Sequence, residues 1–519
     1  MLSTSLILGL TLLAQVPPPA IGPAAGDDLT ACREAILKRE AKELEALAQR
    51  LERRGGSDEV AAVRRLLTTA GAHRGVSSLA PLPQVVPGRG EGLASIAGKP
   101  SEKTALPGRQ ELEEARSRAA SELYALAKRA AATNPPHIAQ TALCLRAILE
   151  RTPDHPEARR LTGYVPYNGG WARPFAVRQL KAGNVDHPVF GWVPADWVVH
   201  LDRGELPAPA SRGQKQVRWL PARQADSLRA SWQNPWQIAT EHFEIQADVP
   251  LGEAVEFARR LEAFYDLFFT LMADVVGENL PLARRLRSAA LSGEGSYRPH
   301  QVWYFASDEE YVKHLTPLAG AGISGSLGYY NPPRPGKGSR AVAYFFRDQG
   351  GQLPVTATLY HEVSHQLLFE TAGPNAYTKN AGNYWVFEGL GTYFETVTPR
   401  SDGTLEFGGL AGPRMAAARQ MLAAGKFVPL DQFLQLDQNA FNRDERIREN
   451  YQQAMALAVF LMQWDGAVYR DAFLDYVRDA YRGRIKRSTG RSLEDRVGKP
   501  LPVLEGQLRA FLAAGEGVP

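Results

Sequence analysis

The segment YHEVSHQLLFE, residues 360–370, places two histidines four positions apart, with a glutamate directly after the first. On a helix, residues at positions i and i+4 share one face, with Cβ atoms roughly 5–6 Å apart, so His361 and His365 can point at one atom. Residues 356–369 surround this face with apolar side chains and contain no Gly or Pro. The pattern therefore predicts one uninterrupted, buried helix that carries two ligands of a metal site.

Zinc is the metal that this arrangement suits. Catalytic zinc sites use three protein ligands, with His nitrogens at about 2.0–2.1 Å, and leave the fourth position to water. The water needs a base. Glu362 follows His361 directly, projects toward the same site and can take the proton while zinc lowers the pKa of the water toward about 7. The motif predicts one zinc ion with Glu362 as general base.

A second segment supplies the expected third ligand. An extended metzincin motif needs glycine at position 368 and histidine at position 371, and Leu368 and Thr371 exclude it. In YWVFEGLGTYFE, residues 384–395, Glu388 has apolar neighbours on both sides, and coordination to a cation removes the cost of burying its charge. Glu395 lies two helical turns further along the same face, where it either hydrogen-bonds the far nitrogen of a zinc-bound histidine or stays in solvent.

The two motifs together resemble those of a known family. The H-E-x-x-H helix is followed about twenty residues later by W-x-x-E-G-x-x-x-Y-x-E and is preceded by a strand, as in gluzincin metallopeptidases, a clan that includes thermolysin and the zinc aminopeptidases. In its pattern of motifs and predicted elements, the sequence most resembles peptidase-MA-like domains of exported bacterial proteins, over roughly residues 236–512. This resemblance implies that His361, His365 and Glu388 bind zinc and that Glu362 is the general base.

The resemblance also implies a substrate-binding strand and an oxyanion donor. AVAYFF, residues 341–346, is expected to be the edge strand along which a peptide substrate pairs through its backbone. The expected contacts come from Ala341, Val342, Ala343 and Tyr344. Tyr451 lies where aminopeptidase relatives place a tyrosine that stabilises the oxyanion, and a core aromatic at a helix start is the alternative. Because no G-x-M-E-N segment lies upstream, endopeptidase action is expected rather than aminopeptidase action.

The N-terminal part of the chain shows helical periodicity interrupted by loops. Residues 27–75 and 110–162 are each expected to form a helical hairpin region, which resembles tetratricopeptide-type pairs; an ordinary helical bundle is the alternative. The Pro- and Gly-rich stretch 76–109 predicts a linker between them. Residues 163–207 contain several Trp and β-branched residues and predict a module of short strands.

The C-terminal part, residues 236–512, predicts an α+β domain. Strand patterns at 239–249, 301–307 and 340–348 alternate with helical patterns, and the remainder is mainly helical. By the resemblance stated above, this is a thermolysin-like arrangement with a small mixed sheet and a helical C-terminal part.

Length and charge restrict the class of function. The 519 residues allow about two to four domains. The formal charge of +4 is spread over 60 basic and 56 acidic side chains without a long run of one sign, so no nucleic-acid partner is expected. An apolar run near the start suits a signal peptide over residues 1–20 and predicts a secreted or periplasmic protein without a membrane span. Cys32 and Cys144 fall in helical patterns, either as buried thiols or as a disulfide.

The expected function is hydrolysis of peptide bonds in a peptide or protein substrate by a secreted zinc metallopeptidase. Zinc polarises the scissile carbonyl, Glu362 activates water and later protonates the leaving amine, and Tyr451 stabilises the tetrahedral intermediate. The alternative is a non-catalytic, zinc-containing scaffold whose N-terminal helices bind a protein partner. Hydrolysis of a non-peptide bond, such as a cell-wall amide, would use the same site.

Overall fold

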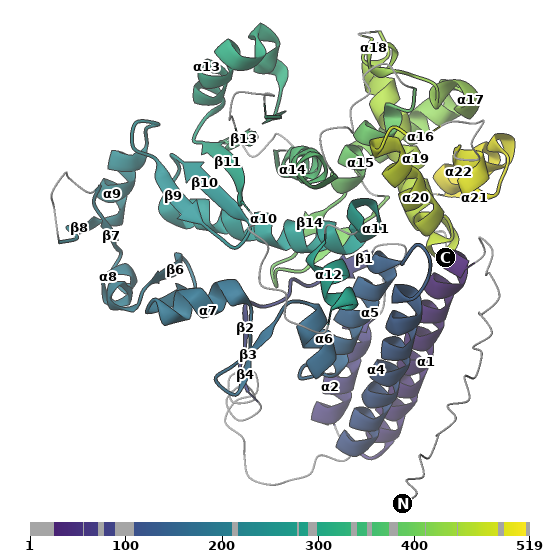
Figure 1. The fold of residues 1–519 in the computed structure, drawn as a ribbon, viewed down its shortest axis with the longest axis horizontal. Coiled ribbons are helices and arrows are strands. Elements are labelled where there is room, and N and C mark those ends of the chain that lie inside the picture. The colour runs from purple at the N-terminus through teal and green to yellow at the C-terminus, as the bar shows by residue number, and fades with distance from the viewer. Residues whose placement is uncertain are drawn as a thin grey trace, which may run out of the picture.

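The computed structural model describes residues 25–514, apart from 56, 71–76, 89–107, 210–215, 278–279, 289–297, 334–339, 350–354, 373–381, 411, 444 and 486–491. The expected signal peptide, residues 1–20, lies outside the described residues. The described chain is α+β, as the sequence predicts, with a helical bundle at one end and a sheet with its covering helices at the other (Figure 1). None of the described helices is both long enough and apolar enough to traverse a lipid bilayer.

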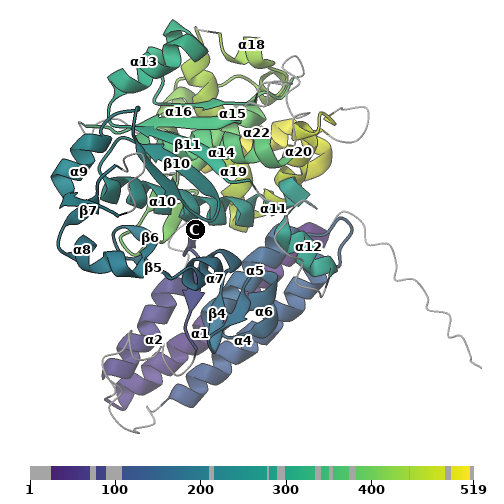
Figure 2. The same cartoon turned by 60° about the vertical axis from the view of Figure 1, so that its left-hand side comes forward.

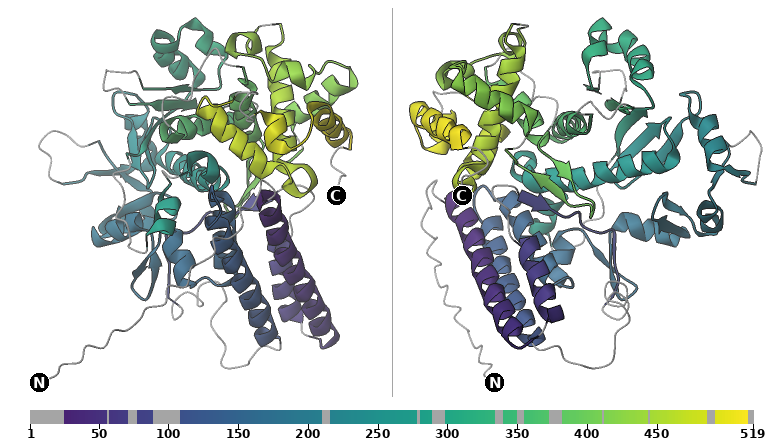
Figure 3. Two further views of the ribbon diagram at one scale, coloured as in Figure 1. Left: turned by 45° about the vertical axis from the view of Figure 1, so that its right-hand side comes forward. Right: turned by 180° about the vertical axis from the view of Figure 1, so that it is seen from behind.

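Four long helices near the N-terminus form the bundle, and Figure 3 shows them side by side. They are α1 (Ala25–Arg53), α2 (Ser57–Ala70), α4 (Arg109–Ala131) and α5 (Ile138–Arg151), followed by the short α6 (Pro156–Leu161). Because α1 packs against both α2 and α4, the two expected hairpins join in one bundle. Within it Arg151 and Glu40 form a buried ion pair. Cys144 is buried and Cys32 half-buried, and they are not joined in a disulfide.

Part of the stretch expected to be a linker, residues 76–109, is built into sheets. The pairs are β1 (Ser77–Leu79) with β15 (Leu405–Phe407), which also pairs with β14 (Thr398–Pro399), and β2 (Val85–Val86) with β4 (Gly170–Ala172). The linker prediction is therefore wrong for residues 77–79 and 85–86, which form strands. Pairing with distant strands satisfies the backbone N–H and C=O groups of these residues. Their side chains show no strand periodicity, so the sequence does not reveal this pairing.

The described part of residues 163–229 forms three successive units, each a β-hairpin followed by a helix (Figure 1). The hairpins are β3 (Val165–Tyr167) with β4, β5 (Asn184–His187) with β6 (Gly191–Pro194), and β7 (Glu205–Pro207) with β8 (Trp219–Pro221). The helices are α7 (Pro174–Lys181), α8 (Val198–Asp202) and α9 (Ala222–Arg229). We call these residues the hairpin module. Its end was predicted at residue 207, which is wrong because β7 and β8 pair across that point.

A proline marks the passage from strand to helix in each unit. Each second strand carries a Trp followed closely by Pro, at Trp171 and Pro174, Trp192 and Pro194, and Trp219 and Pro221. Proline lacks an N–H and cannot extend a ladder, but it is tolerated at the start of a helix. The recurring Trp and Pro positions are the sequence signal of this internal repeat.

A five-stranded mixed sheet lies at the centre of the C-terminal part, in the order β12–β13–β11–β10–β9. The strands are β9 (Trp236–Ala239), β10 (Phe243–Ala247), β11 (His300–Phe305), β12 (Gly328–Asn331) and β13 (Val342–Phe346). The three inner strands are parallel, and β9 and β12 pair antiparallel at opposite edges. The three inner strands are those that the strand patterns at 239–249, 301–307 and 340–348 predict.

The strand expected at the substrate-binding edge, residues 341–346, is an inner strand. β13 pairs with β11 on one side and with β12 on the other, where Val342 lies opposite Asn331 and Tyr344 opposite Tyr329. Ala341, Val342, Ala343 and Tyr344 are therefore wrong as an edge for strand addition. β12 comes from a loop rich in Gly and Pro, but its aromatic residues favour a strand once β13 offers an open edge.

Helices cover both faces of the sheet. α10 (Leu251–Leu271) and α14 (Val355–Ala372) pack on one face with Ala343 and Phe345, and α13 (Asp308–Ala319) packs on the other with Tyr344 and Phe346. The remaining helices include α11 (Ala273–Val276), α12 (Pro281–Arg287), α15 (Trp385–Phe394), α16 (Pro413–Ala423), α17 (Leu430–Phe433), α18 (Gln438–Phe441), α19 (Ile447–Ala467), α20 (Arg470–Tyr481), α21 (Leu493–Val497) and α22 (Leu501–Ala514). Of these, α15 packs against α14 and α19 and closes the core.

The bundle joins the rest of the chain through buried polar contacts. Asp274 in α11 accepts hydrogen bonds from the N–H groups of Ile138 and Ala139, the first residues of α5. Gln140 donates to Asp471 in α20. Burial and the charge of Asp471 raise the pKa of Asp274 to about 7, although the two backbone hydrogen bonds oppose this shift. The bundle is thus packed onto α11 and α20 of the C-terminal part.

Candidate metal centre

Helices α14 and α15 bring the three expected ligands together. His361 and His365 project from α14 and Glu388 from α15. The Nε2 atoms of the two histidines are 3.1 Å apart, and Glu388 Oε2 lies 3.4 Å from Nε2 of His361 and 3.7 Å from Nε2 of His365. His361 and Glu388 are each 7% exposed, so the three atoms form a largely buried group that can bind a metal ion.

The spacing of these atoms fits a tetrahedral ion. Bonds of about 2.0–2.1 Å at tetrahedral angles separate neighbouring ligand atoms by about 3.3 Å, close to the observed separations. Burial lowers the pKa of His361, but its contacts with Glu388 and Glu395 outweigh burial and raise it to about 10. The histidines in turn hold the pKa of Glu388 well below its usual value, against the effect of burial. The carboxylates therefore favour positive charge at this group.

Glu395 holds the other side of the His361 ring. Its Oε1 atom lies 3.0 Å from Nδ1 of His361, on the ring nitrogen that faces away from His365 and Glu388. Its second oxygen accepts a hydrogen bond from Nε of Arg414 in α16. The carboxylate is 12% exposed and thus not the solvated surface group of the alternative interpretation. Arg414 was not expected from the sequence, since it lies in another helix with no motif.

Gly391 allows α14 and α15 to approach at the metal group. A Cβ atom at this position would lie 2.7 Å from Nε2 and 2.8 Å from Cε1 of His361, closer than real Cβ contacts. Only glycine permits the observed position of the imidazole. The signal for this residue was present in the sequence as the second glycine of EGLG, but its role depends on the packing of two helices.

Tyr384 is a further residue that the sequence did not single out. Its hydroxyl donates to Glu388 Oε1 at 2.8 Å and receives a weak hydrogen bond from Gln438 at 3.4 Å. Glu388 Oε2 faces the histidines, so Tyr384 orients the carboxylate through the other oxygen, Oε1. A tyrosine four residues before a candidate ligand on a helix is the signal that could have revealed it.

Glu362 lies between the metal group and the sheet edge. Burial and the charge of Glu388 raise the pKa of Glu362, although the two histidines and a hydrogen bond from the Tyr330 backbone oppose this shift. A Cβ atom at Gly328 would lie 3.2 Å from Glu362 Cγ, so β12 passes directly beside the carboxylate. Glu362 therefore lies next to the edge strand and is not one of the three candidate ligands.

Tyr451, which belongs to α19, also lies at this group. Its ring stacks at 6.5 Å from the His361 ring, and the Arg414 guanidinium lies 5.7 Å from the Tyr451 ring centre. Burial and the charge of Glu388 raise its pKa far above the ordinary value, so the hydroxyl keeps its proton. Tyr451 is thus both packed in the core and directed at the metal group, and the two interpretations of this residue are compatible.

One family model matches part of the chain. Residues 355–484 match the family described as "Protein of unknown function (DUF1570)". The matched part begins with α14 and ends after α20, so it contains every residue of the metal group. No curated protein matches the chain.

Proposed function

We propose that this protein is a zinc-dependent peptidase of the gluzincin type, acting as an endopeptidase. The observation that supports the proposal best is the spacing of His361, His365 and Glu388 at tetrahedral ligand distances, with an additional carboxylate, Glu362, beside them. The mixed sheet beside the ligand-bearing helix supports a thermolysin-like arrangement. The apolar segment within residues 1–20 makes export part of this proposal.

The chain's own residues divide the chemistry between them. His361, His365 and Glu388 would hold zinc, which polarises the scissile carbonyl and makes water more acidic when bound. Glu362 takes a proton from the attacking water and delivers it to the leaving amine nitrogen. The neutral Tyr451 hydroxyl donates to the carbonyl oxygen as it gains negative charge.

The substrate is proposed to lie along β12. This strand is the sheet edge on the side of Glu362, and among the described strands it pairs only with β13. An extended peptide can form a further antiparallel or parallel pair with residues 328–331 through backbone groups alone. Such pairing favours internal segments of a chain and gives little selectivity for sequence, which agrees with endopeptidase action.

The variant Glu362→Gln tests the mechanism. It should retain zinc, measured by metal analysis, and lose cleavage of casein or of a peptide library, because glutamine fills the same volume but accepts no proton. Wild type should lose the same activity to a chelator and regain it with zinc. Undiminished turnover in Glu362→Gln would exclude this base, and absent or chelator-insensitive cleavage would favour the non-catalytic scaffold.

A further inference from the structure

A large cavity lies at the sheet edge opposite to the metal centre. Its volume is about 2110 Å³, and it is enclosed by the hairpin module, α10, β9 and the bundle. In Figure 2 the module curves from α9 through α8 to α7 beside α10. The metal group lies near β12, whereas the cavity borders β9 at the opposite edge of the sheet. The cavity reaches α14 only at Glu370 and Thr371, and neither His361, His365, Glu388 nor Glu362 lines it. The cavity is therefore not part of the proposed active site.

The cavity follows the free edge of β9. All four residues of the strand, Trp236, Gln237, Ile238 and Ala239, line it. Consecutive side chains of a strand point to opposite faces, so a space that touches all four must run along the strand edge. β10 occupies the other edge, and no described strand pairs with β9 on the cavity side.

The hydrogen-bond pattern shows which backbone groups face the cavity. The Thr240 N–H donates to the Phe243 carbonyl at 2.9 Å, which makes these two residues a hydrogen-bonded pair. In an antiparallel ladder such pairs alternate with pairs whose N–H and C=O groups point outward. Since Ala239 lies opposite Glu244 and Gln237 opposite Gln246, these are the outward positions. Both residues are exposed.

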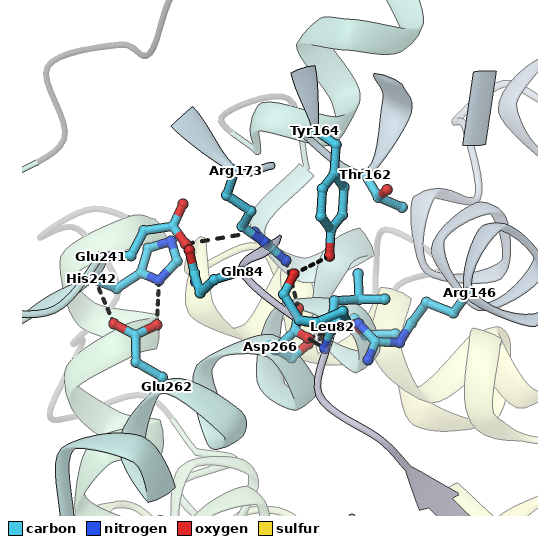
Figure 4. Close-up of polar contacts among 12 residues, drawn as sticks. Leu82, Gln84, Arg146, Thr162, Tyr164, Arg173, Glu241, His242, Glu262 and Asp266 are labelled. Atoms are coloured by element: carbon cyan, nitrogen blue, oxygen red, sulfur yellow. Dashed lines mark hydrogen bonds and ion pairs between the residues drawn. The ribbon is translucent and has the colours of Figure 1, made fainter. Parts of the chain in front are cut away.

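One part of the cavity lining is a compensated charge network, shown in Figure 4. Asp266 of α10 pairs with Arg146 of the bundle at 3.0 Å and lies 3.6 Å from Arg173 of the module. His242 and Glu262 form a second pair at 2.7 Å. These contacts join the bundle, the hairpin module and α10 around the cavity and leave little net charge in this part of the lining.

Over the whole cavity lining, arginines outnumber carboxylates. Ten arginines and no lysine line the cavity, against six carboxylates, and each of those carboxylates is held in an ion pair with a described residue. Of the arginines, Arg400 pairs with Glu406, which lies outside the lining. Arg218 of the module and Arg284 of α12 are exposed and form no ion pair with the described carboxylates. Guanidinium groups recognise carboxylates in a bidentate geometry, so the cavity favours an acidic ligand.

From this geometry we infer that the cavity binds an extended acidic segment of another polypeptide, which adds as a strand along β9. The outward backbone groups of Gln237 and Ala239 provide the pairing, and the arginines provide the preference for Glu and Asp side chains. This site is independent of the proposed hydrolysis at the metal centre.

Fluorescence anisotropy of a labelled peptide tests the inference. The probe is a short fluorescein-labelled peptide in which Glu and Thr alternate, and the protein is the full chain carrying Glu362→Gln, so that the probe is not cut. The peptide should bind saturably. Replacing each Glu by Lys should weaken binding about tenfold or more, because the charge is reversed. Methylating alternate backbone nitrogens should weaken it by a similar factor, because the backbone donors are lost.

Matched protein variants locate the site. Ala239→Pro removes one outward N–H at an edge position that tolerates proline, and Arg218→Glu reverses one charge; each should weaken binding about tenfold. Arg203→Glu, an exposed arginine of the module that does not line the cavity, should leave binding unchanged. Equal binding of the Lys peptide would overturn the inference. So would binding that His365→Ala abolishes while both cavity variants retain it, because the peptide would then lie at the metal centre.

Discussion

Glu395 Oε1 lies 3.0 Å from His361 Nδ1, so one carboxylate determines which nitrogen of His361 faces the other ligands. An imidazole that donates its Nδ1–H to a carboxylate keeps Nε2 unprotonated and more basic. Arg414 holds the same carboxylate from its far side, which ties the ring orientation to a third helix.

Removal of this carboxylate should weaken metal binding. Glu395→Ala is expected to lower zinc affinity about tenfold to a hundredfold, because the His361 ring loses its orienting acceptor. Competition against a fluorescent zinc chelator measures the change. Glu309→Ala, at an exposed position of α13, serves as the control and should bind as wild type does. Equal affinities for the two variants would contradict the role of Glu395.

A methyl group at Gly391 should disturb the metal group directly. The new Cβ of Gly391→Ala would lie 2.7 Å from His361 Nε2, so either the imidazole or α15 must move, and zinc affinity should fall. Gly506→Ala is the matched control, since apart from its chain neighbours and the backbone of α22 itself no atom lies within 4 Å of its Cβ position. It should leave zinc affinity unchanged and stabilise the fold by about 0.5–1 kcal/mol, as read from thermal unfolding.

The Tyr451 hydroxyl should matter for turnover rather than for metal binding. Tyr451→Phe retains the ring that packs near His361 and removes only the donor. If the proposed peptidase activity holds, kcat should fall about a hundredfold to a thousandfold with little change in KM, while zinc content stays at the wild-type level. A normal kcat would leave Tyr451 with a packing role alone.

Asp274 should make the contact between the bundle and α11 sensitive to pH. An unfolded Asp has a pKa of about 3.9, and burial with the neighbouring Asp471 raises that of folded Asp274 to about 7. The folded state therefore binds the proton up to a higher pH, and its stability falls as pH rises from about 4 to about 7. Asp274→Asn retains an acceptor for the α5 N–H groups but carries no charge.

Thermal unfolding at two pH values checks this expectation. Asp274→Asn should match wild type at pH values near 4 and exceed it near 8, by on the order of a few kcal/mol. The comparison between the two proteins isolates this carboxyl from other titrating groups. Identical pH profiles would show that Asp274 ionises in the folded protein as it does in the unfolded chain.

The elements that depend on local pattern could be predicted. The helix of His361 and His365, the segment of Glu388 and the three inner strands all have a periodicity that residues close in sequence create. Arg414, Tyr384 and Gly391 could not be predicted, since their roles arise from contacts between separate helices. The hairpin module was misjudged at residue 207 because a short hairpin with a long connection has little periodicity.

The amino-acid order by itself determined which side chains can bind a metal together, since positions four apart on one helix share a face wherever that helix packs. The tertiary structure alone decided that β12, and not residues 341–346, lies at the sheet edge beside Glu362. It also decided that β9 borders an arginine-lined cavity. Backbone hydrogen bonds between distant strands leave no trace in side-chain pattern, so the order of strands in a sheet follows only from the folded chain.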